Sequence, residues 1–335
     1  MGKRTKYLPR PALGLDVFAI FWHHHHGMDC RANHRGSQYL AATGVPRRGA
    51  VDFDFHAVAE HDAVLSISRK MRQRNFKTAL VLSAIIAMLA AITSLGGLHF
   101  SDLYRDSEFI KNAWFANDWV TLVVAVPGLI ASMRLVQKGS QRAQLVWMGL
   151  LLYMLYNYAF YLFGAAFNEF FLLYVALFTL SGYALIFGLS SLDVNAISQK
   201  FDKKTPVLWL GIFLFFLAVP LLVVEGGRCI KFIFNGIEPE APSLIFALDL
   251  SFVVPATILA AVWLWQRRAW GYVLSTMMLV KGVTYVLVLS ASALRLFLID
   301  SPERDEFLPF YLFVATGSVV GLTALLRNLR PKANN

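Results

Sequence analysis

Eight long apolar segments constrain this 335-residue chain more than any other feature of its sequence. Each is close to the roughly 20 residues that a helix needs to cross the hydrocarbon core of a bilayer. They span residues 78–98, 115–135, 143–163, 170–191, 206–225, 243–265, 270–293 and 307–326. Hydrophobic residues make up 57% of the chain and charged residues 16%, so one soluble core could not bury the apolar side chains. Because the runs are continuous and lack a period of two, they exclude a membrane β-barrel and predict an all-α integral membrane protein, an eight-helix bundle.

The basic residues predict which side of the membrane each connection faces. Lys and Arg are retained on the cytoplasmic side of membrane proteins. Sixteen of them fall before the first segment, in every second connection and in the C-terminal tail, against six in the opposite connections. Both termini are therefore predicted to be cytoplasmic, with the chain in a cell membrane such as the bacterial inner membrane. The net charge of +10 is spread over these loops, which favours contact with the lipid bilayer and argues against nucleic acid as a partner.

Short motifs recur in the same order in the two halves of the chain. Phe115–Asp118 with Pro127 in the first half matches Phe246–Asp249 with Pro255 in the second. Other matches are Lys77-Thr78 with Lys204-Thr205, Gln141-Arg142 with Gln266-Arg267, and Asn168-Glu169-Phe170 with Asp305-Glu306-Phe307. Such recurrence indicates duplication of a four-segment unit. Since four is an even number, both copies enter the membrane from the same side, and we expect two parallel four-helix repeats over residues 71–200 and 201–330.

The first 70 residues differ in composition from the rest of the chain. They contain seven of the eight histidines and no apolar run long enough to cross a membrane. From Met71 the chain reads Met-Arg-Gln-Arg-Asn-Phe-Lys, which is typical of a protein start that leads into a first span. We therefore expect residues 1–70 to be a disordered cytoplasmic tail or an over-extended reading frame.

A metal site in this tail is a weaker alternative. Its donors are His23, His24, His25, His26, Asp29, Cys30 and His34. Consecutive histidines do not match the ligand spacing of a tetrahedral zinc site. No histidine follows His99 in the chain, which argues against haem or His-based zinc sites in the later segments. The sequence therefore predicts neither a metal nor a cofactor.

Charged residues inside the apolar segments are the first candidates for a functional site. Asp249 in the sixth segment and Lys281 in the seventh are expected at similar depth, because the two helices run in opposite directions. An unpaired charge there costs several kcal/mol, so we expect the two to pair, either as a binding site or as a link between helices. Asp118, which matches Asp249 in the repeated motif, begins the second segment. It is either a first-turn carboxylate favoured by the helix dipole or a site residue.

Aromatic and amide side chains form a second group of candidates. Tyr153, Asn157 and Tyr161 recur every four residues in the third segment and therefore share one helix face. Lys281 and Tyr285 form a comparable face in the seventh segment. Such faces line ligand pockets or pack against neighbouring helices through hydrogen bonds.

A resemblance adds to this interpretation. Around the end of the third segment the chain reads Tyr156-Asn157-Tyr158-Ala159-Phe160-Tyr161-Leu162-Phe163-Gly164-Ala165-Ala166-Phe167-Asn168. With this string it resembles a group of uncharacterised bacterial multi-pass membrane proteins, over about residues 71–330. The resemblance implies the eight-helix membrane fold and brings no substrate or reaction with it.

Three classes of function fit these residues. The favoured class is a transporter or ligand-binding membrane protein for a small molecule or ion, with an outward-facing polar pocket between the repeats. Its candidate residues are Asp118, Tyr153, Asn157, Tyr161, Asp249, Lys281 and Tyr285. The second class is an intramembrane enzyme that uses Asp118 and Asp249 as an acid–base pair. Because Gly-x-Gly-Asp, Gly-x-Ser-x-Gly and His-Glu-x-x-His motifs are absent, no residue is assigned as catalytic. The third is a structural or sensory subunit whose charges only organise helices.

Overall fold

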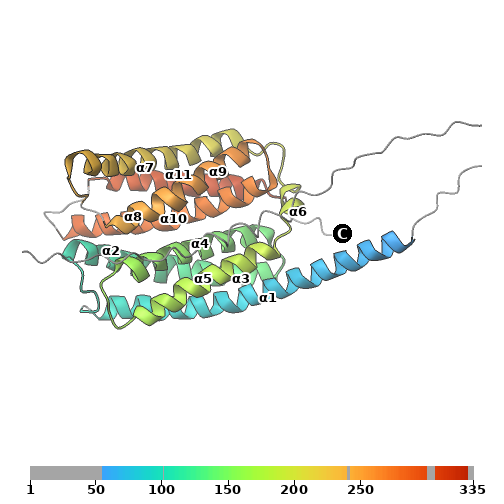
Figure 1. The fold of residues 1–335 in the computed structure, drawn as a ribbon, viewed down its shortest axis with the longest axis horizontal. Helices are drawn as coiled ribbons and strands as arrows, with labels where there is room; N and C mark the ends of the chain where they lie inside the picture. The colour runs from blue at the N-terminus through green and yellow to red at the C-terminus, as the bar shows by residue number, and fades with distance from the viewer. Residues whose placement is uncertain (1–54, 101, 240–241, 300–305, 331–335) are drawn as a thin grey trace, which may run out of the picture. The chain divides into compact units, whose positions relative to one another are not determined.

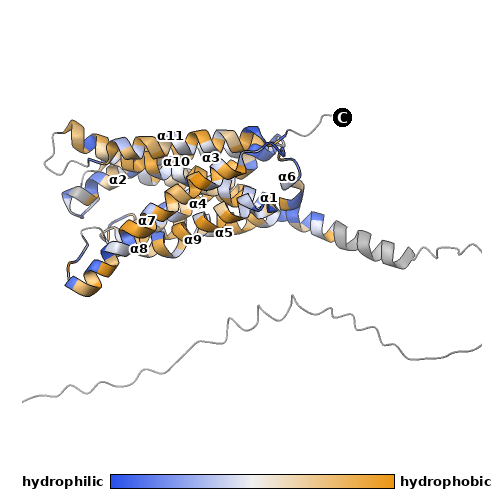
Figure 2. Cartoon of the chain, turned by 90° about the horizontal axis from the view of Figure 1, so that it is seen from above, coloured by the Kyte–Doolittle hydropathy of each residue, from blue (hydrophilic) through white to orange (hydrophobic). Residues whose placement is uncertain are grey.

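The computed structural model describes residues 55–100, 102–239, 242–299 and 306–330. Within these residues the protein is helical, apart from an isolated β-bridge between Phe201 and Leu329. Eight helices of the described chain are long and apolar enough to cross a membrane, which confirms the predicted number of spans. Figure 2 shows apolar residues along the helices and hydrophilic residues gathered near their ends.

The predicted segments agree with the helices to within a few residues at most ends. In the first half the helices are α1 Phe55–His99, α2 Glu108–Val120, η1 Thr121–Ala125, α3 Val126–Gln137, α4 Gln141–Gly164 and α5 Phe171–Ser191. In the second half they are α6 Val194–Ser198, α7 Val207–Asn235, α8 Ser243–Leu248, η2 Asp249–Val253, α9 Val254–Trp265, α10 Ala269–Leu298 and α11 Leu308–Arg327. The runs α2–η1–α3 and α8–η2–α9 each form one continuous span.

Two helices are longer than the sequence predicted. α1 begins at Phe55, so residues 55–70 are helical and continuous with the first span. The part of the tail before residue 55, including the histidine-rich motif, lies outside the described residues. α7 continues to Asn235, ten residues beyond the predicted segment. This extension keeps Glu225 and Arg228 inside a helix.

Helices α4 and α10 form the centre of the bundle (Figure 1). They pack against each other, and α4 is the most buried of the eight spans. A Cβ atom on Gly149 of α4 would lie 2.5 Å from the Cβ atom of Val280 on α10, so glycine is what permits this close approach. The outer helices follow one neighbour pattern on both sides: α5 packs on α1 and α4, and α11 packs on α7 and α10.

The second span of each half contains a π-helical turn. The turns are Thr121–Ala125 and Asp249–Val253, and each is followed two residues later by a proline, Pro127 or Pro255. Proline lacks an N–H, and its ring clashes with the carbonyl four residues earlier in a regular α-helix. A wider turn just before the proline relieves this conflict. The first residue of each turn therefore holds the same place in its helix.

Candidate functional site

The second half contains a buried charged cluster around Asp249, the first residue of η2. The hydroxyl of Tyr156 on α4 donates a hydrogen bond to Asp249 Oδ1. The Nζ atom of Lys281 on α10 lies 3.6 Å from the centroid of the Tyr156 ring and 4.8 Å from that of Tyr285. Asp249 and Lys281 are each 5% exposed. No ion pair within 4.0 Å joins them among the described residues; instead Tyr156 contacts both, with its hydroxyl on one side and its ring face on the other.

Glu225 on α7 belongs to the same cluster, although the sequence did not single it out. It is 6% exposed, and its Oε2 atom has no hydrogen-bond partner among the described residues. It interacts electrostatically with Asp249, Arg228 and Lys281. The carboxyls of Glu225 and Asp249 are close enough to share a hydrogen bond, which requires that one of them carry a proton.

The first half has a neutral cluster at the matching place. The Tyr153 hydroxyl lies 3.0 Å from Thr121 Oγ1 and donates to Asn117 Oδ1 at 3.3 Å. Asn157 Nδ2 donates to Thr121 Oγ1 at 3.4 Å. All four residues are buried. Hydrogen bonds between neutral groups therefore tie α4 to the second span of the first half.

A single offset of 128 residues relates the two clusters. The matching pairs are Thr121–Asp249, Tyr153–Lys281, Asn157–Tyr285 and Pro127–Pro255. The repeated motif instead matched Asp118 with Asp249. Because Asp118 lies nine residues before its proline and Asp249 only six, the π turns align Asp249 with Thr121 and place Asp118 about one helical turn earlier.

Asp118 lies in a separate hydrogen-bonded setting. Its Oδ2 accepts from the Tyr104 hydroxyl at 2.5 Å, and its Oδ1 accepts from the Tyr161 hydroxyl at 2.9 Å. Burial, helped by the Asp118 charge, raises the pKa of Tyr104 above its ordinary value, so this hydroxyl keeps its proton and donates. A Cβ atom on Gly97 would lie 2.0 Å from Asp118 Oδ2, so the absence of a side chain there makes room for the carboxyl. Gly97 precedes Glu225 by the same 128 residues.

The predicted site residues thus fall into three groups and not into one pocket. Asp249, Lys281 and Tyr285 lie together, and Tyr153 lies with Asn157. The remaining two, Asp118 and Tyr161, bond to each other. Helix α4 serves both halves, because one of its tyrosines reaches Asp118 and another reaches Asp249.

A cavity of about 260 Å³ lies one helical turn from the charged cluster. It is lined by Arg228, Lys231, Ile237, Glu238 and Pro239. Arg228 follows Glu225 by three residues on α7, and the two interact electrostatically. None of the seven predicted site residues lines this cavity, so the polar pocket expected between the halves stays a prediction.

Metal chemistry and known relatives give no further direction. Within the described residues, no group of three or more His, Cys, Asp or Glu side chains is placed to hold a metal ion. Comparisons with protein-family models, curated proteins and solved structures found no match for the chain. No likeness found in these comparisons therefore points to a substrate.

Proposed function

We propose that this chain is a multi-pass membrane protein that binds and transports a small ion or small molecule, with Glu225, Asp249 and Lys281 as its working residues. The observation that carries the proposal is the unpartnered Oε2 atom of Glu225, buried among described apolar helices. With all three residues ionised, two negative charges face one positive charge. A proton or a monovalent cation would neutralise the remaining charge, whereas leaving it buried costs several kcal/mol.

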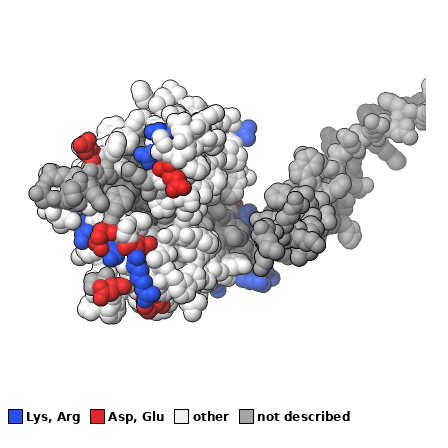
Figure 3. All heavy atoms as spheres, turned by 60° about the vertical axis from the view of Figure 1, so that its left-hand side comes forward, with Lys and Arg blue, Asp and Glu red and all other residues white. Residues whose placement is uncertain are grey.

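The proposed architecture consists of two parallel four-helix repeats, residues 71–200 and 201–330, with both termini in the cytoplasm of a bacterial cell. The shared 128-residue offset, the two π turns and the matching neighbour pattern all support a duplication. The face of the molecule in Figure 3 shows acidic and basic side chains intermixed. Such a mixture is what the positive-inside rule allows on the side away from the cytoplasm.

The cavity beside Arg228 supplies a route to the charged cluster in this proposal. Arg228 and Lys231 line its wall, and Glu225 lies one turn further along α7. A proton or cation that enters there meets Glu225 first and Asp249 next. Protonation of one carboxyl would release the other to interact with Lys281, which couples occupancy to the contacts between α7, η2 and α10.

The burial of the cluster favours a second candidate, a purely structural link between helices. Asp118 fits this role, because both of its carboxyl oxygens accept hydrogen bonds from tyrosine hydroxyls. Glu225 fits it poorly, since a structural link between Asp249 and α10 needs no second acid with an unpartnered oxygen.

The predicted acid–base pair of an intramembrane enzyme gains no support. Asp118 bonds to Tyr104 and Tyr161, whereas Asp249 bonds to Tyr156. The two carboxylates therefore belong to different clusters. We keep the enzyme class only as an alternative for the Glu225–Asp249 pair.

A thermal-unfolding screen of the full chain in detergent tests the proposal. The ligands are Na⁺, K⁺, amino acids and sugars, and the variants are Glu225→Gln and Asp249→Asn, with Asp118→Asn as the matched control that removes a buried carboxyl from the other half. A ligand at 100 times its dissociation constant should stabilise the parent and Asp118→Asn by about 2.7 kcal/mol, and the other two variants much less. If no ligand separates the two groups of variants, the structural role is correct.

A further inference from the structure

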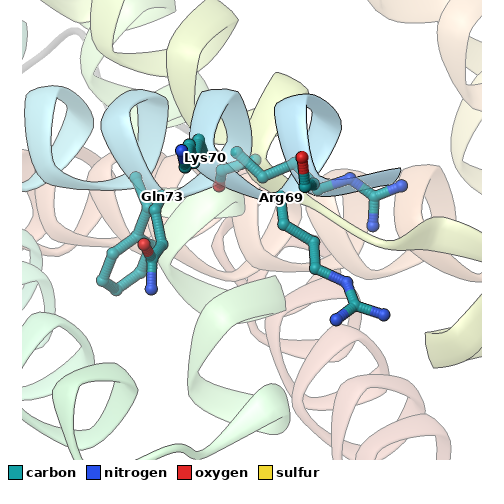
Figure 4. A pocket seen from close by; sticks show the side chains of 7 residues that line it. Arg69, Lys70 and Gln73 are labelled. Atoms are coloured by element: carbon teal, nitrogen blue, oxygen red, sulfur yellow. The ribbon is translucent and has the colours of Figure 1, made fainter. Parts of the chain in front are cut away.

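A basic cavity lies away from both clusters, between α1 and the end of α5. Its volume is about 810 Å³. The lining residues are Ser66, Arg69, Lys70, Arg72, Gln73, Phe76 and Ser191. Figure 4 shows Arg69, Lys70 and Gln73 projecting from helix α1. Cationic and hydrogen-bonding side chains thus share one wall with an aromatic ring.

Most of the positive charge at this cavity is not neutralised. Arg72 Nη1 lies 2.6 Å from Asp193 Oδ2, an ion pair at the rim. In the described part of the chain, neither Arg69 nor Lys70 has an ion-pair partner. Three lining cations against one neighbouring acid leave two positive charges, which suits an anionic group.

The position along α1 places the cavity at the edge of a bilayer. The span Ser66–His99 has 34 residues, whereas about 20 suffice to cross the hydrocarbon core. If residues 78–98 fill that core, residues 66–76 emerge at the level of the lipid headgroups. Beyond the cavity, α1 and α5 pack together and expose apolar side chains such as Val81 and Ile186. The cavity therefore connects a cationic end with an apolar, lipid-facing surface.

We propose that this cavity binds the headgroup of one anionic glycerophospholipid. Arg69 and Lys70 bind the phosphate, because guanidinium donates two parallel hydrogen bonds to such a group and ammonium adds a point charge. Gln73 and Ser191 donate to the ester and glycerol oxygens. The acyl chains lie along the exposed apolar side chains of α1 and α5. A free inorganic anion matches the charge but leaves the apolar continuation unused.

Lipid binding to the purified full chain tests this site. Native mass spectrometry and thermal unfolding are measured with phosphatidylglycerol, with phosphatidylcholine of the same acyl chains, and with inorganic phosphate. The test variant is Arg69→Gln with Lys70→Gln. The control is Arg134→Gln with Lys138→Gln, which removes the same charge from exposed residues around the end of α3.

The expected result is selective binding of phosphatidylglycerol by the parent and by the control. The test variant should bind it roughly thirtyfold more weakly, since each basic residue near an anionic surface contributes about a factor of five. Equal losses in the two double variants would show general surface attraction and overturn the site. Equal binding of phosphatidylcholine, or equal stabilisation by inorganic phosphate at the same concentration, would also overturn it.

Discussion

The two clusters occupy matching places in the bundle and differ in charge. In the first half, Thr121, Tyr153 and Asn157 are neutral, and their hydrogen bonds are made locally. The matching residues of the second half are Asp249, Lys281 and Tyr285. Both clusters lie at a π turn that precedes a proline. The backbone geometry is therefore compatible with either a neutral or a charged set.

This difference shows that charge is not needed to hold the helices at this level. Neutral hydrogen bonds suffice in the first half, where the carboxyl of Asp118 is also fully bonded. In the second half Glu225 stands where the first half has Gly97, and it adds an acid whose Oε2 is unpartnered among the described residues. We interpret the first cluster as scaffold and the second as the reactive site.

The largest expected effect comes from Lys281→Met. The change leaves two buried acids, Asp249 and Glu225, without their cation, so the free energy of unfolding should fall by about 3–5 kcal/mol. The matched control is Tyr153→Phe at the corresponding place, which removes one hydroxyl and should cost about 0.5–1.5 kcal/mol. Unfolding in detergent measures both. Equal losses would show that the two clusters do not differ in their electrostatics.

Next in size is the effect of making the neutral cluster charged. Thr121→Asp introduces the acid of the second half without a cation, and should cost about 2.5–3.5 kcal/mol. Adding Tyr153→Lys recreates the second-half combination and should recover part of that loss. The pair is measured as a double-mutant cycle. Strictly additive losses would break the proposed equivalence of the two positions.

A smaller effect is expected from Gly97→Ala. The new Cβ would lie 2.0 Å from Asp118 Oδ2 and 2.3 Å from the Tyr104 hydroxyl, so overpacking should cost about 1–3 kcal/mol. Gly227→Ala on α7 is the control, because no described atom lies within 4 Å of a Cβ there. Higher helix propensity should make the control neutral or more stable by up to about 1 kcal/mol. If both variants have the same stability, the Asp118 setting is not tightly packed.

The sequence predicted the spans well because length and hydropathy decide what crosses a membrane. It missed Glu225, since an acid at the end of an apolar run looks like a boundary. The apolar residues from Cys229 to Phe234 continue α7 beyond it, and they were the available signal. The direct Asp249–Lys281 pair was also a reasonable expectation from depth alone. Side-chain geometry decides instead that Tyr156 contacts both.

The register between the halves was beyond the motif match for a related reason. Matching letters aligned Asp118 with Asp249, because both follow a Phe-Ala pair. A π turn adds no letter of its own and shows only as backbone geometry. Once the turns are visible, Thr121 and Asp249 coincide, and so do the tyrosine and lysine that face them.

The smallest effect concerns a surface ion pair, which sets the baseline for charge in this molecule. The side chains of Arg72 and Asp193 are 43% and 50% exposed, so solvent screens their attraction. Asp193→Asn should cost only about 0.2–1 kcal/mol, against several for a buried charge. The amide preserves the cap on the Ala196 N–H, so the variant isolates the charge.

The pH dependence of this pair gives the comparison its last test. The Ala196 N–H and the Arg72 guanidinium hold the pKa of Asp193 below its ordinary value. A lowered pKa stabilises the fold above the unfolded value of about 3.9, and this contribution is lost as the pH falls through the folded value. The parent should therefore unfold at a slightly higher temperature than Asp193→Asn at pH 7, and the difference should shrink at pH 3. A gap that persists at pH 3 would mean that hydrogen-bond geometry, and not charge, stabilises the α5–α6 connection.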